Sequence, residues 1–209
     1  MHPGLPPFTL AIAGGSGSGK TSLARALVGQ LGPNECALLD HDSYYRDLSH
    51  LPPAERAATN FDHPDSLDSA LLARHLDDLR AGRAVQRPRY DFATHSRQPT
   101  ATRVEPRPVI VCEGILLLAV PELRHAFDLR VYVDTPADVR ALRRVQRDIS
   151  ERGRTVESVV QQYLDTVRPM HERFVEPARE TADLVLGWQH PVHEWATIVL
   201  ATMRGRRQN

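Results

Sequence analysis

The sequence predicts an α/β fold in which helices flank a parallel β-sheet. Short apolar runs of strand length recur along the chain, and segments of helix length separate them. A glycine-rich loop directly follows the first of these runs. Strands buried on both faces are typically continuous apolar runs, and their alternation with helices is typical of a doubly wound sheet. With 209 residues the chain is long enough to bury a sizeable core. We expect a single domain over residues 1–209.

The apolar runs predict the strands at residues 8–14, 36–40, 108–115, 129–134 and 182–187. Segments of helical length or pattern occupy residues 23–31, 67–81, 136–150 and 155–180. Cys36 and Cys112 lie inside apolar runs, where a free thiol usually behaves as a small buried hydrophobe. We therefore expect no disulfide between them, as is usual in a reducing cytosol.

Two segments do not follow this alternation. Residues 83–107 are rich in proline and arginine and contain a Tyr-Asp-Phe cluster, which predicts an irregular or hairpin-like insertion. The last twenty residues predict a helix that ends in a frayed arginine tail at 204–207. Such a tail is usually solvated, so we expect no nucleic-acid partner there.

The composition excludes several classes of protein. Lys and Arg number 26 and so do Asp and Glu, so the formal net charge is zero, and there is no overall attraction to nucleic acid or anionic lipid. No apolar run reaches the roughly 20 residues that span a bilayer, and residues 1–14 lack the basic start of a signal peptide. We therefore expect a cytoplasmic protein without a membrane partner.

A glycine-rich loop predicts phosphate binding. Gly14 to Thr21 match the pattern GxxxxGK[ST], in which backbone N–H groups surround phosphate oxygens, the lysine neutralises them and the hydroxyl binds Mg²⁺. A flexible turn would share this composition, but the predicted strand before the loop and the helix after it favour a P-loop NTPase-type fold. The expected ATP-binding residues of the loop are Gly14, Gly15, Ser16, Gly17, Ser18, Gly19, Lys20, Thr21 and Ser22.

Lys20 is the only lysine in the chain. The guanine-reading motif Asn-Lys-x-Asp of GTP-binding switches is therefore absent, which argues against an ordinary GTPase.

Two acids are predicted at strand ends beside the loop. Asp42 follows the strand at 36–40, and Glu113 lies at the end of the apolar run that begins at residue 108. Ligands bind outside the carboxyl ends of parallel strands, so both acids face the phosphate loop. Asp42 is a candidate base for an acceptor hydroxyl or a metal ligand through water, and Glu113 is a candidate Mg²⁺ ligand. A capping or turn role for Asp42 is the alternative.

An arginine-rich segment at about 144–155 predicts a lid over the phosphates. Arg144, Arg147, Arg152 and Arg154 cannot all lie on one helical face. Guanidinium groups that close over a triphosphate would exclude water and stabilise the negative charge of the transition state. The alternative is a solvated basic helix end.

Six motifs occur in order: the glycine loop, DHDSYY, NFDHPDSLD, YDFATHSR, VIVCEGILLL and DTPADVRALRRVQRDISERGR. Together they resemble the uridine kinase (uridine-cytidine kinase) family over residues 8 to about 186. The resemblance implies a P-loop kinase domain that phosphorylates the ribose 5'-hydroxyl of uridine and cytidine, giving UMP and CMP for pyrimidine salvage. It also implies Mg²⁺ and ATP, with GTP as a possible donor, and a homo-oligomer, commonly a tetramer.

The resemblance also implies roles for single residues. Asp42 matches the catalytic base and a residue near the metal, Thr21 and Glu113 match Mg²⁺ positions, and Lys20 and Arg147 act on the transferred phosphoryl group. Arg152 and Arg154 are expected to contact ATP. The expected nucleoside-binding residues are Tyr45, Phe61, Asp62, Tyr90, Phe92, His95, Arg144 and Gln162.

Within that set, Asp62 and Arg144 match residues that grip the ribose 2'- and 3'-hydroxyls. The aromatic residues resemble the walls of a base pocket, although aromatic side chains more often simply pack in a core. His95 matches the base edge, and a change of tautomer would let it face either the uracil carbonyl or the cytosine amino group. We therefore predict that both nucleosides are substrates.

Two departures from the resembled pattern, Pro136 and the Leu-Leu-Leu after Ile115, touch no residue assigned to chemistry. The alternative functions are a related kinase, such as phosphoribulokinase or pantothenate kinase, and a nucleotide-binding regulator without catalysis. The first would not need Tyr90, Phe92 and His95, and the presence of Asp42 and Glu113 argues against the second.

Overall fold

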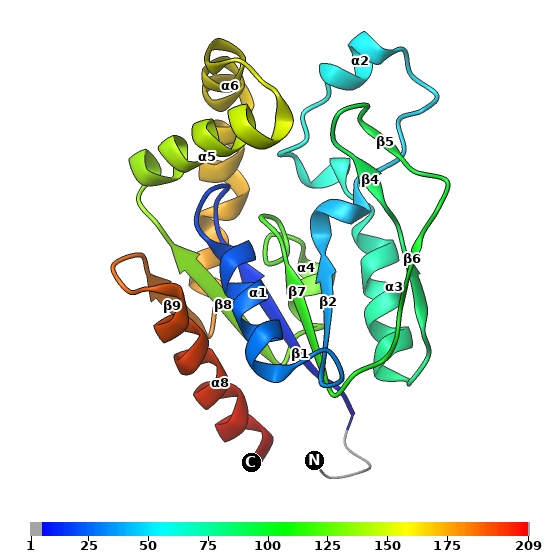
Figure 1. The fold of residues 1–209 in the computed structure, drawn as a ribbon, viewed down its shortest axis with the longest axis vertical. Helices are drawn as coiled ribbons and strands as arrows, with labels where there is room; N and C mark the ends of the chain where they lie inside the picture. Colours follow the sequence, from blue (N-terminus) through cyan, green and yellow to red (C-terminus); the bar gives the residue numbers. More distant parts are fainter. Residues whose placement is uncertain (1–5, 209) are drawn as a thin grey trace.

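A five-stranded parallel sheet forms the centre of the protein (Figure 1). The computed structural model describes residues 6–208. Residues 1–5, the first part of the N-terminal stretch 1–14 that lacks the basic start of a signal peptide, lie outside the described residues. The strand order is β2-β7-β1-β8-β9, and every neighbouring pair is parallel. The α/β prediction is confirmed. The strands are β1 Phe8–Ala13, β2 Cys36–Asp40, β7 Val109–Glu113, β8 Leu129–Asp134 and β9 Leu184–Gly187.

The register of the central strands brings the acids to the loop. Asp40 at the end of β2 is level with Glu113 at the end of β7, and Glu113 is level with Ile12 of β1. Every residue of β1 and β7 is buried, as expected for strands covered on both faces. The phosphate loop leaves β1 at this same edge, so the sheet itself places the loop beside the two acidic strand ends.

Helices cover both faces of the sheet. Helix α1 (Lys20–Leu31) and helix α8 (Val192–Gln208) pack on one face with the apolar side chains of β1 and β7. Helix α3 (Ser69–Arg80), the short α4 (Pro121–Arg124) and residues 171–181 cover the other face. Two apolar cores therefore hold the sheet rigid beneath the functional edge, because each buries surface that would otherwise face water.

Helix α5 (Ala137–Arg152) lies over the carboxyl ends of the strands and leads to α6 (Val156–Gln162) (Figure 1). The prediction of one helix at 155–180 is wrong in detail. After α6 come a π-helical turn at Tyr163–Val167, α7 at Arg168–Met170, a second π-helical turn at His171–Val175 and a 3₁₀ turn at Pro177–Thr181. Pro169 lacks the N–H that a regular α-helix needs, and the wider turns lie on both sides of it.

The insertion at 83–107 is hairpin-like, as predicted. Strand β3 (Val85–Arg87) pairs antiparallel with β6 (Thr102–Val104), and β4 (Tyr90–Asp91) pairs antiparallel with β5 (Ser96–Arg97). Arg87 ties it to the sheet through an ion pair with Asp40. Arg97 ties it to the segment after β2, because its Nε donates to the Tyr45 carbonyl at 2.7 Å.

Three short elements lie between β2 and α3: the 3₁₀ helix η1 at His41–Tyr44, α2 at Pro53–Ala57 and a 3₁₀ turn at Pro64–Ser66. Cys36 and Cys112 are buried free thiols, as predicted. Across residues 6–208, none of the helices combines the length and the apolar character that a membrane crossing requires.

The prediction of a frayed arginine tail is wrong. Helix α8 continues to Gln208, and the guanidinium of Arg206 lies 3.1 Å from a carboxylate oxygen of Asp183. Arg207 donates to the Pro108 carbonyl at 2.6 Å. These contacts hold the last turn of the helix against the strand starts.

Candidate active site

The phosphate loop joins β1 to α1 and depends on glycine at particular positions. Gly14, Gly17 and Gly19 have φ values of 146°, 81° and 103°, in the region that side chains disfavour. A Cβ on Gly17 would lie 2.4 Å from the carbonyl oxygen of Arg140, and one on Gly14 would lie 2.6 Å from that of Val133. The loop therefore fits closely against β8 and α5, and its shape is set by backbone contacts.

Three predicted residues meet at the start of α1. Thr21 Oγ1 donates to Glu113 Oε1 at 2.8 Å, and Lys20 Nζ lies 4.0 Å from Glu113 Oε2. Lys20 and Glu113 are both buried. Burial raises the pKa of Glu113 above its ordinary value, although the Lys20 ammonium opposes that rise.

These residues fit a magnesium ion. Asp42 Oδ1 is buried and has no hydrogen-bond partner, which leaves an acceptor for a cation, water or substrate hydroxyl. No group of three His, Cys, Asp or Glu side chains suited to a metal occurs within residues 6–208. Mg²⁺ usually takes only one or two carboxylates and completes its shell with waters and substrate phosphates. Thr21 and Glu113 supply such a partial set.

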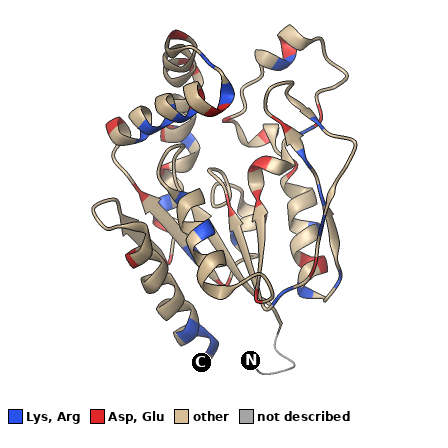
Figure 2. Cartoon of the chain, viewed as in Figure 1, with Lys and Arg blue, Asp and Glu red and all other residues tan. Residues whose placement is uncertain are grey.

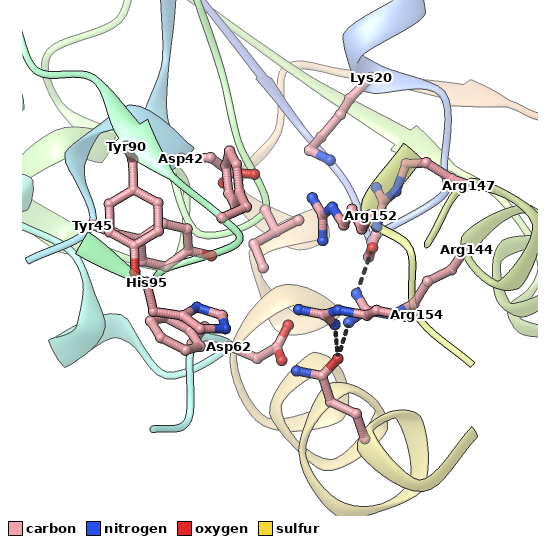
Figure 3. A pocket seen from close by; sticks show the side chains of 15 residues that line it. Lys20, Asp42, Tyr45, Asp62, Tyr90, His95, Arg144, Arg147, Arg152 and Arg154 are labelled. Carbon is pink, nitrogen blue, oxygen red and sulfur yellow. Dashed lines mark hydrogen bonds between the residues drawn. The ribbon is translucent and has the colours of Figure 1, made fainter. Parts of the chain in front are cut away.

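A pocket with two unlike walls lies beside the loop; we call it the aromatic pocket (Figure 3). Tyr45, Tyr90 and His95 form one wall, and arginines from α5 and the turn after it form the other. The structure brings together here all eight predicted nucleoside-binding residues. The lining consists of Ser16, Lys20, Asp42, Tyr45, Phe61, Asp62, Tyr90, Phe92, His95, Ile115, Arg144, Arg147, Arg152, Arg154 and Gln162.

The aromatic wall is a packed cluster with one open side. The ring centroids of Tyr45 and Tyr90 are 5.1 Å apart, and those of Tyr90 and Phe92 are 5.3 Å apart. The Phe61 and His95 rings stack at 4.6 Å with 15° between their planes. These side chains pack against each other and also line a cavity, so core packing alone does not describe them.

His95 has an unusual backbone. Among residues 6–208 it is the non-glycine residue with a positive φ, 52°. Such a backbone conformation is unfavourable, so contacts within the surrounding turn must stabilise it. Asp91 fixes that turn by accepting from the backbone N–H of Ala93 at 2.8 Å and of Thr94 at 3.3 Å. Burial, then the nearby Arg154 and Arg152, lowers the pKa of His95 below its ordinary value. The ring is therefore neutral near pH 7.

Two acids lie in the aromatic pocket. Asp42 belongs to η1, and its neighbour His41 is fully buried, which lowers the histidine pKa to about 3 and keeps it uncharged. Asp62 is buried and accepts from Thr166 Oγ1 at 3.3 Å. Burial raises the pKa of Asp62, and Arg144 opposes the rise. Two acceptors thus lie in the aromatic pocket opposite its positively charged wall.

The arginine segment is mostly helix. Arg144 and Arg147 lie on α5, Arg152 is its last residue, and Arg154 follows Gly153, which ends the helix at φ 62°. The expected lid at 144–155 is therefore the second half of a helix plus a short turn. Gln162 of α6 links the helix to this turn, because its Oε1 accepts hydrogen bonds from Arg144 at 2.9 Å and from Arg154 at 2.6 Å. Figure 2 shows the basic positions along α5 above the acidic ends of β2 and β7.

A second pocket lies on the other side of the loop; we call it the loop pocket. Thr21 and Ser22 lie in its lining, whereas Arg152 and Arg154 line the aromatic pocket and Glu113 lines neither. That those two arginines contact ATP stays a prediction. The lining is Gly17, Gly19, Lys20, Thr21, Ser22, Arg25, Arg143, Arg147, Glu151, Trp188, Gln189, His190, Pro191, Val192 and Trp195.

Sequence reasoning missed residues 187–195 of this pocket. Trp195 Nε1 donates to the Gly187 carbonyl at 2.9 Å, and a Cβ on Gly19 would lie 3.2 Å from the Trp195 ring. Trp188 lies in the same lining and is 40% exposed. The available signal was position: a turn with an aromatic residue directly follows the last strand of the sheet, at the edge where the loop lies.

Lys20 and Arg147 line both pockets. The fold and this site define a P-loop enzyme of the small-molecule kinase class, because a phosphate loop and an acid-bearing pocket share their cationic residues.

The chain belongs to the phosphoribulokinase / uridine kinase family, whose model matches residues 9–191. A uridine kinase of Chloroflexus aggregans is 55% identical over 188 residues, which are 89% of this chain and 90% of that protein. A uridine kinase of Brevibacillus brevis is 50% identical over 86% of this chain and 84% of that protein. The fold is similar to that of phosphoribulokinase from Rhodobacter spheroides, with a TM-score of 0.65 and 13% identity over 87% of this chain and 70% of that one.

Proposed function

We propose that the protein is a uridine/cytidine kinase that transfers the γ-phosphoryl group of ATP to the ribose 5'-hydroxyl, giving UMP and CMP. The observation that carries the proposal is that Lys20 and Arg147 line both pockets. A phosphoryl group bound by these two residues lies between a donor in the loop pocket and an acceptor in the aromatic pocket. The uridine kinases at 55% and 50% identity support the same assignment.

Asp42 is proposed as the general base. Its carboxylate lines the aromatic pocket, and its buried Oδ1 is free to accept the proton of the 5'-hydroxyl as that oxygen attacks phosphorus. Lys20 and Arg147 then stabilise the charge on the transferred group, and the loop amides hold the donor in line. Thr21 and Glu113 would hold Mg²⁺, which neutralises phosphate charge when bound.

Asp62 and Arg144 are proposed to bind the ribose 2'- and 3'-hydroxyls. Both are buried side chains in the pocket lining, and a deoxynucleoside would leave them unpaired at a cost larger than that of a lost methylene. The rings of Tyr45, Tyr90 and Phe92 would flank the pyrimidine, with His95 at its edge. A related kinase acting on a sugar phosphate or pantothenate has no need for this aromatic wall, which favours the nucleoside.

The family resemblance also supports a cytoplasmic homo-oligomer, commonly a tetramer, with GTP as an alternative donor. Large apolar side chains on α5 and the turn after α6 are exposed, Leu142 at 72% and Leu164 at 55%. Single exposed apolar side chains are normal on a monomer, so the proposed oligomer rests on the resemblance. Sedimentation equilibrium of the purified protein tests the oligomer, and a monomer over a wide concentration range would contradict it.

The decisive experiment measures ADP release from Mg-ATP with uridine, cytidine, deoxycytidine, adenosine, ribulose 5-phosphate and pantothenate as acceptors. We expect rapid turnover with uridine and cytidine only. Turnover with just one pyrimidine nucleoside would contradict the dual role of His95. Binding of ATP without turnover of uridine or cytidine would indicate that the protein acts on another acceptor or has a regulatory function.

A further inference from the structure

A single buried carboxylate lies behind the arginine wall. Asp148 of α5 has no solvent-exposed surface, and four guanidinium groups lie within 4.0 Å of its oxygens. The shortest distances are 2.7 Å to Arg147, 3.5 Å to Arg152, 3.6 Å to Arg154 and 3.7 Å to Arg144. These are the same four arginines that line the aromatic pocket. The side chain of Asp148 is absent from that lining, so it touches the arginines from behind.

The contacts with Asp148 leave many hydrogen-bond donors of the four guanidinium groups unused. Of the four arginines, only Arg147 donates hydrogen bonds to the Asp148 carboxylate, from Nε at 2.9 Å and Nη2 at 2.7 Å, both to Oδ1. Asp148 Oδ2 has no hydrogen-bond partner, and Arg144 Nε, 3.7 Å away, has none either. The other guanidinium groups are thus attracted at ion-pair distance, so donors remain for a phosphate group.

Electrostatics explains why such a residue is needed. Four cations that share one wall repel each other, and the repulsion is strong where water is partly excluded. Burial opposes the ionisation of Asp148, but the surrounding arginines, Arg147 and Arg144 above all, outweigh it and lower the pKa of Asp148 below its ordinary value. The carboxylate is therefore charged at neutral pH and offsets part of the repulsion, while a net positive charge remains for the donor phosphates.

The backbone of Asp148 also contacts one of the four arginines. Its carbonyl accepts from the N–H of Arg154 at 3.1 Å, which turns the chain after Gly153 back toward the pocket. Arg152 lies over the Phe92 ring at 4.9 Å, so the same cluster reaches the aromatic wall. A change at Asp148 would therefore alter the arginines that face both the phosphates and the acceptor.

We propose that Asp148 is a positioning residue that holds Arg147, Arg152 and Arg154 in the arrangement that receives the donor's terminal phosphates, and that holds Arg144 beside them at the acceptor. The proposal rests on the proposed function in so far as it takes the triphosphate of a phosphoryl donor to be the ligand. A purely structural role, in which Asp148 only anchors the end of α5, is the alternative.

The test is Asp148→Asn, which keeps the shape of the side chain and removes its charge. Affinity for the non-hydrolysable donor AMP-PNP with Mg²⁺ is measured by calorimetry. The kcat and KM are measured with uridine, and every measurement is made at a temperature well below the variant's own Tm. We expect AMP-PNP to bind about tenfold more weakly and kcat to fall about 10- to 100-fold, as is typical when a group that orients a ligand's direct partners is lost. The matched control is Asp165→Asn, an exposed carboxylate bonded only to Gln161, which should behave like the wild type.

A double-mutant cycle with Arg152→Gln separates positioning from anchoring. If Asp148 acts through the arginines, Asp148→Asn costs less AMP-PNP affinity in the Arg152→Gln background than in the wild type. Losses that multiply in full would support anchoring alone and overturn the proposal. Wild-type AMP-PNP affinity and kcat in a folded Asp148→Asn protein would also overturn it.

If Asp148→Asn does not fold, Asp148→Glu replaces it, since that variant keeps the charge and displaces the carboxylate by one methylene. We expect weaker AMP-PNP binding there as well, and unchanged binding would contradict the proposal. AMP-PNP binding does not depend on the acceptor. Suppose that the Asp148 variants bind AMP-PNP more weakly than the wild type, but that the wild type does not phosphorylate uridine. This result would refute the uridine kinase function and leave the role of Asp148 intact.

Discussion

The loop pocket and the aromatic pocket share Lys20 and Arg147 but are built in different ways. One side of the loop pocket is a continuous motif, Gly17 to Ser22, whose shape depends on glycine backbone geometry, and the rest comes from α1, α5 and the segment after β9. The aromatic pocket is assembled from side chains of η1, the segment before α3, the hairpin insertion, α5 and α6. The phosphate loop therefore depends on its own backbone geometry, whereas the aromatic pocket depends on side chains from each of its segments.

The difference extends to charge. The aromatic pocket holds Asp42 and Asp62 opposite its arginines, and the loop pocket holds Glu151 among its cations. A triphosphate therefore meets mostly positive charge in either pocket, while a neutral nucleoside is bound by hydrogen bonds to fixed acids. Variants that separate acceptor binding from donor binding test this division.

The largest effect is expected from Asp42→Asn. Loss of a general base typically lowers turnover 100-fold or more, so we expect kcat to fall by at least about 100-fold while ATP affinity is nearly unchanged. Steady-state kinetics with uridine and calorimetry with ATP measure the two quantities. The control is Asp65→Asn, whose side chain is 93% exposed and lies outside both pocket linings. Undiminished turnover in Asp42→Asn would remove Asp42 from the role of base.

Arg144→Ala should act on the acceptor. Arg144 lies in the aromatic pocket, where its Nη2 donates to Gln162 at 2.9 Å and its Nη1 donates to Ser16 at 2.9 Å. A hydrogen bond to a charged group is worth about 1.5–3 kcal/mol, so we expect the KM for uridine to rise about 10- to 100-fold. The KM for ATP should rise much less, and an unchanged KM for uridine would exclude Arg144 from the ribose site.

Trp188→Ala should act on the donor. Trp188 lines only the loop pocket of the two, and a stacked nucleotide base contributes about 1–3 kcal/mol where an aromatic ring supports it. Because Trp188 is 40% exposed, we expect the low end of that range, a rise in the KM for ATP of about fivefold. The KM for uridine should not change, and equal rises in both KM values would show that the pockets are not independent.

The sequence predicted the parts of the site that directly follow or end a strand of the sheet. The glycine loop with Lys20 needs only its own strand and helix, and Asp42 and Glu113 follow from the rule that parallel strands end at one edge. The aromatic pocket could be predicted only by resemblance, because periodicity does not place Phe61, Phe92 and Gln162 in one cavity. Their proximity depends on the hairpin and on where α6 turns back.

Other features had no local signal. The wide helical turns around Pro169 depend on packing over the sheet, and residues 187–195 join the loop only through the order of the strands. Asp148 looked like one charge among many on an arginine-rich helix. Its burial depends on the contacts of four side chains that bend back around it.

The smallest effect concerns His95, which lies in the aromatic wall of the pocket. Burial, Arg154 and Arg152 lower its pKa below the ordinary 6.5, so the neutral ring persists as the pH falls through 6.5, and protonation occurs only at lower pH. A protonated imidazole only donates hydrogen bonds. It can still bind the carbonyl of uracil, but it cannot accept from the amino group of cytosine.

The KM for cytidine should therefore rise a few-fold relative to that for uridine only as the pH falls below the ordinary histidine pKa of 6.5, with little change above it. Both KM values measured from pH 5 to 8 provide the test, and His95→Gln, which does not titrate, provides the control. The ratio should be independent of pH in that variant. A ratio that changes equally in His95→Gln would assign the titration to another group, and a ratio that is constant in the wild type would place His95 away from the amino group of cytosine.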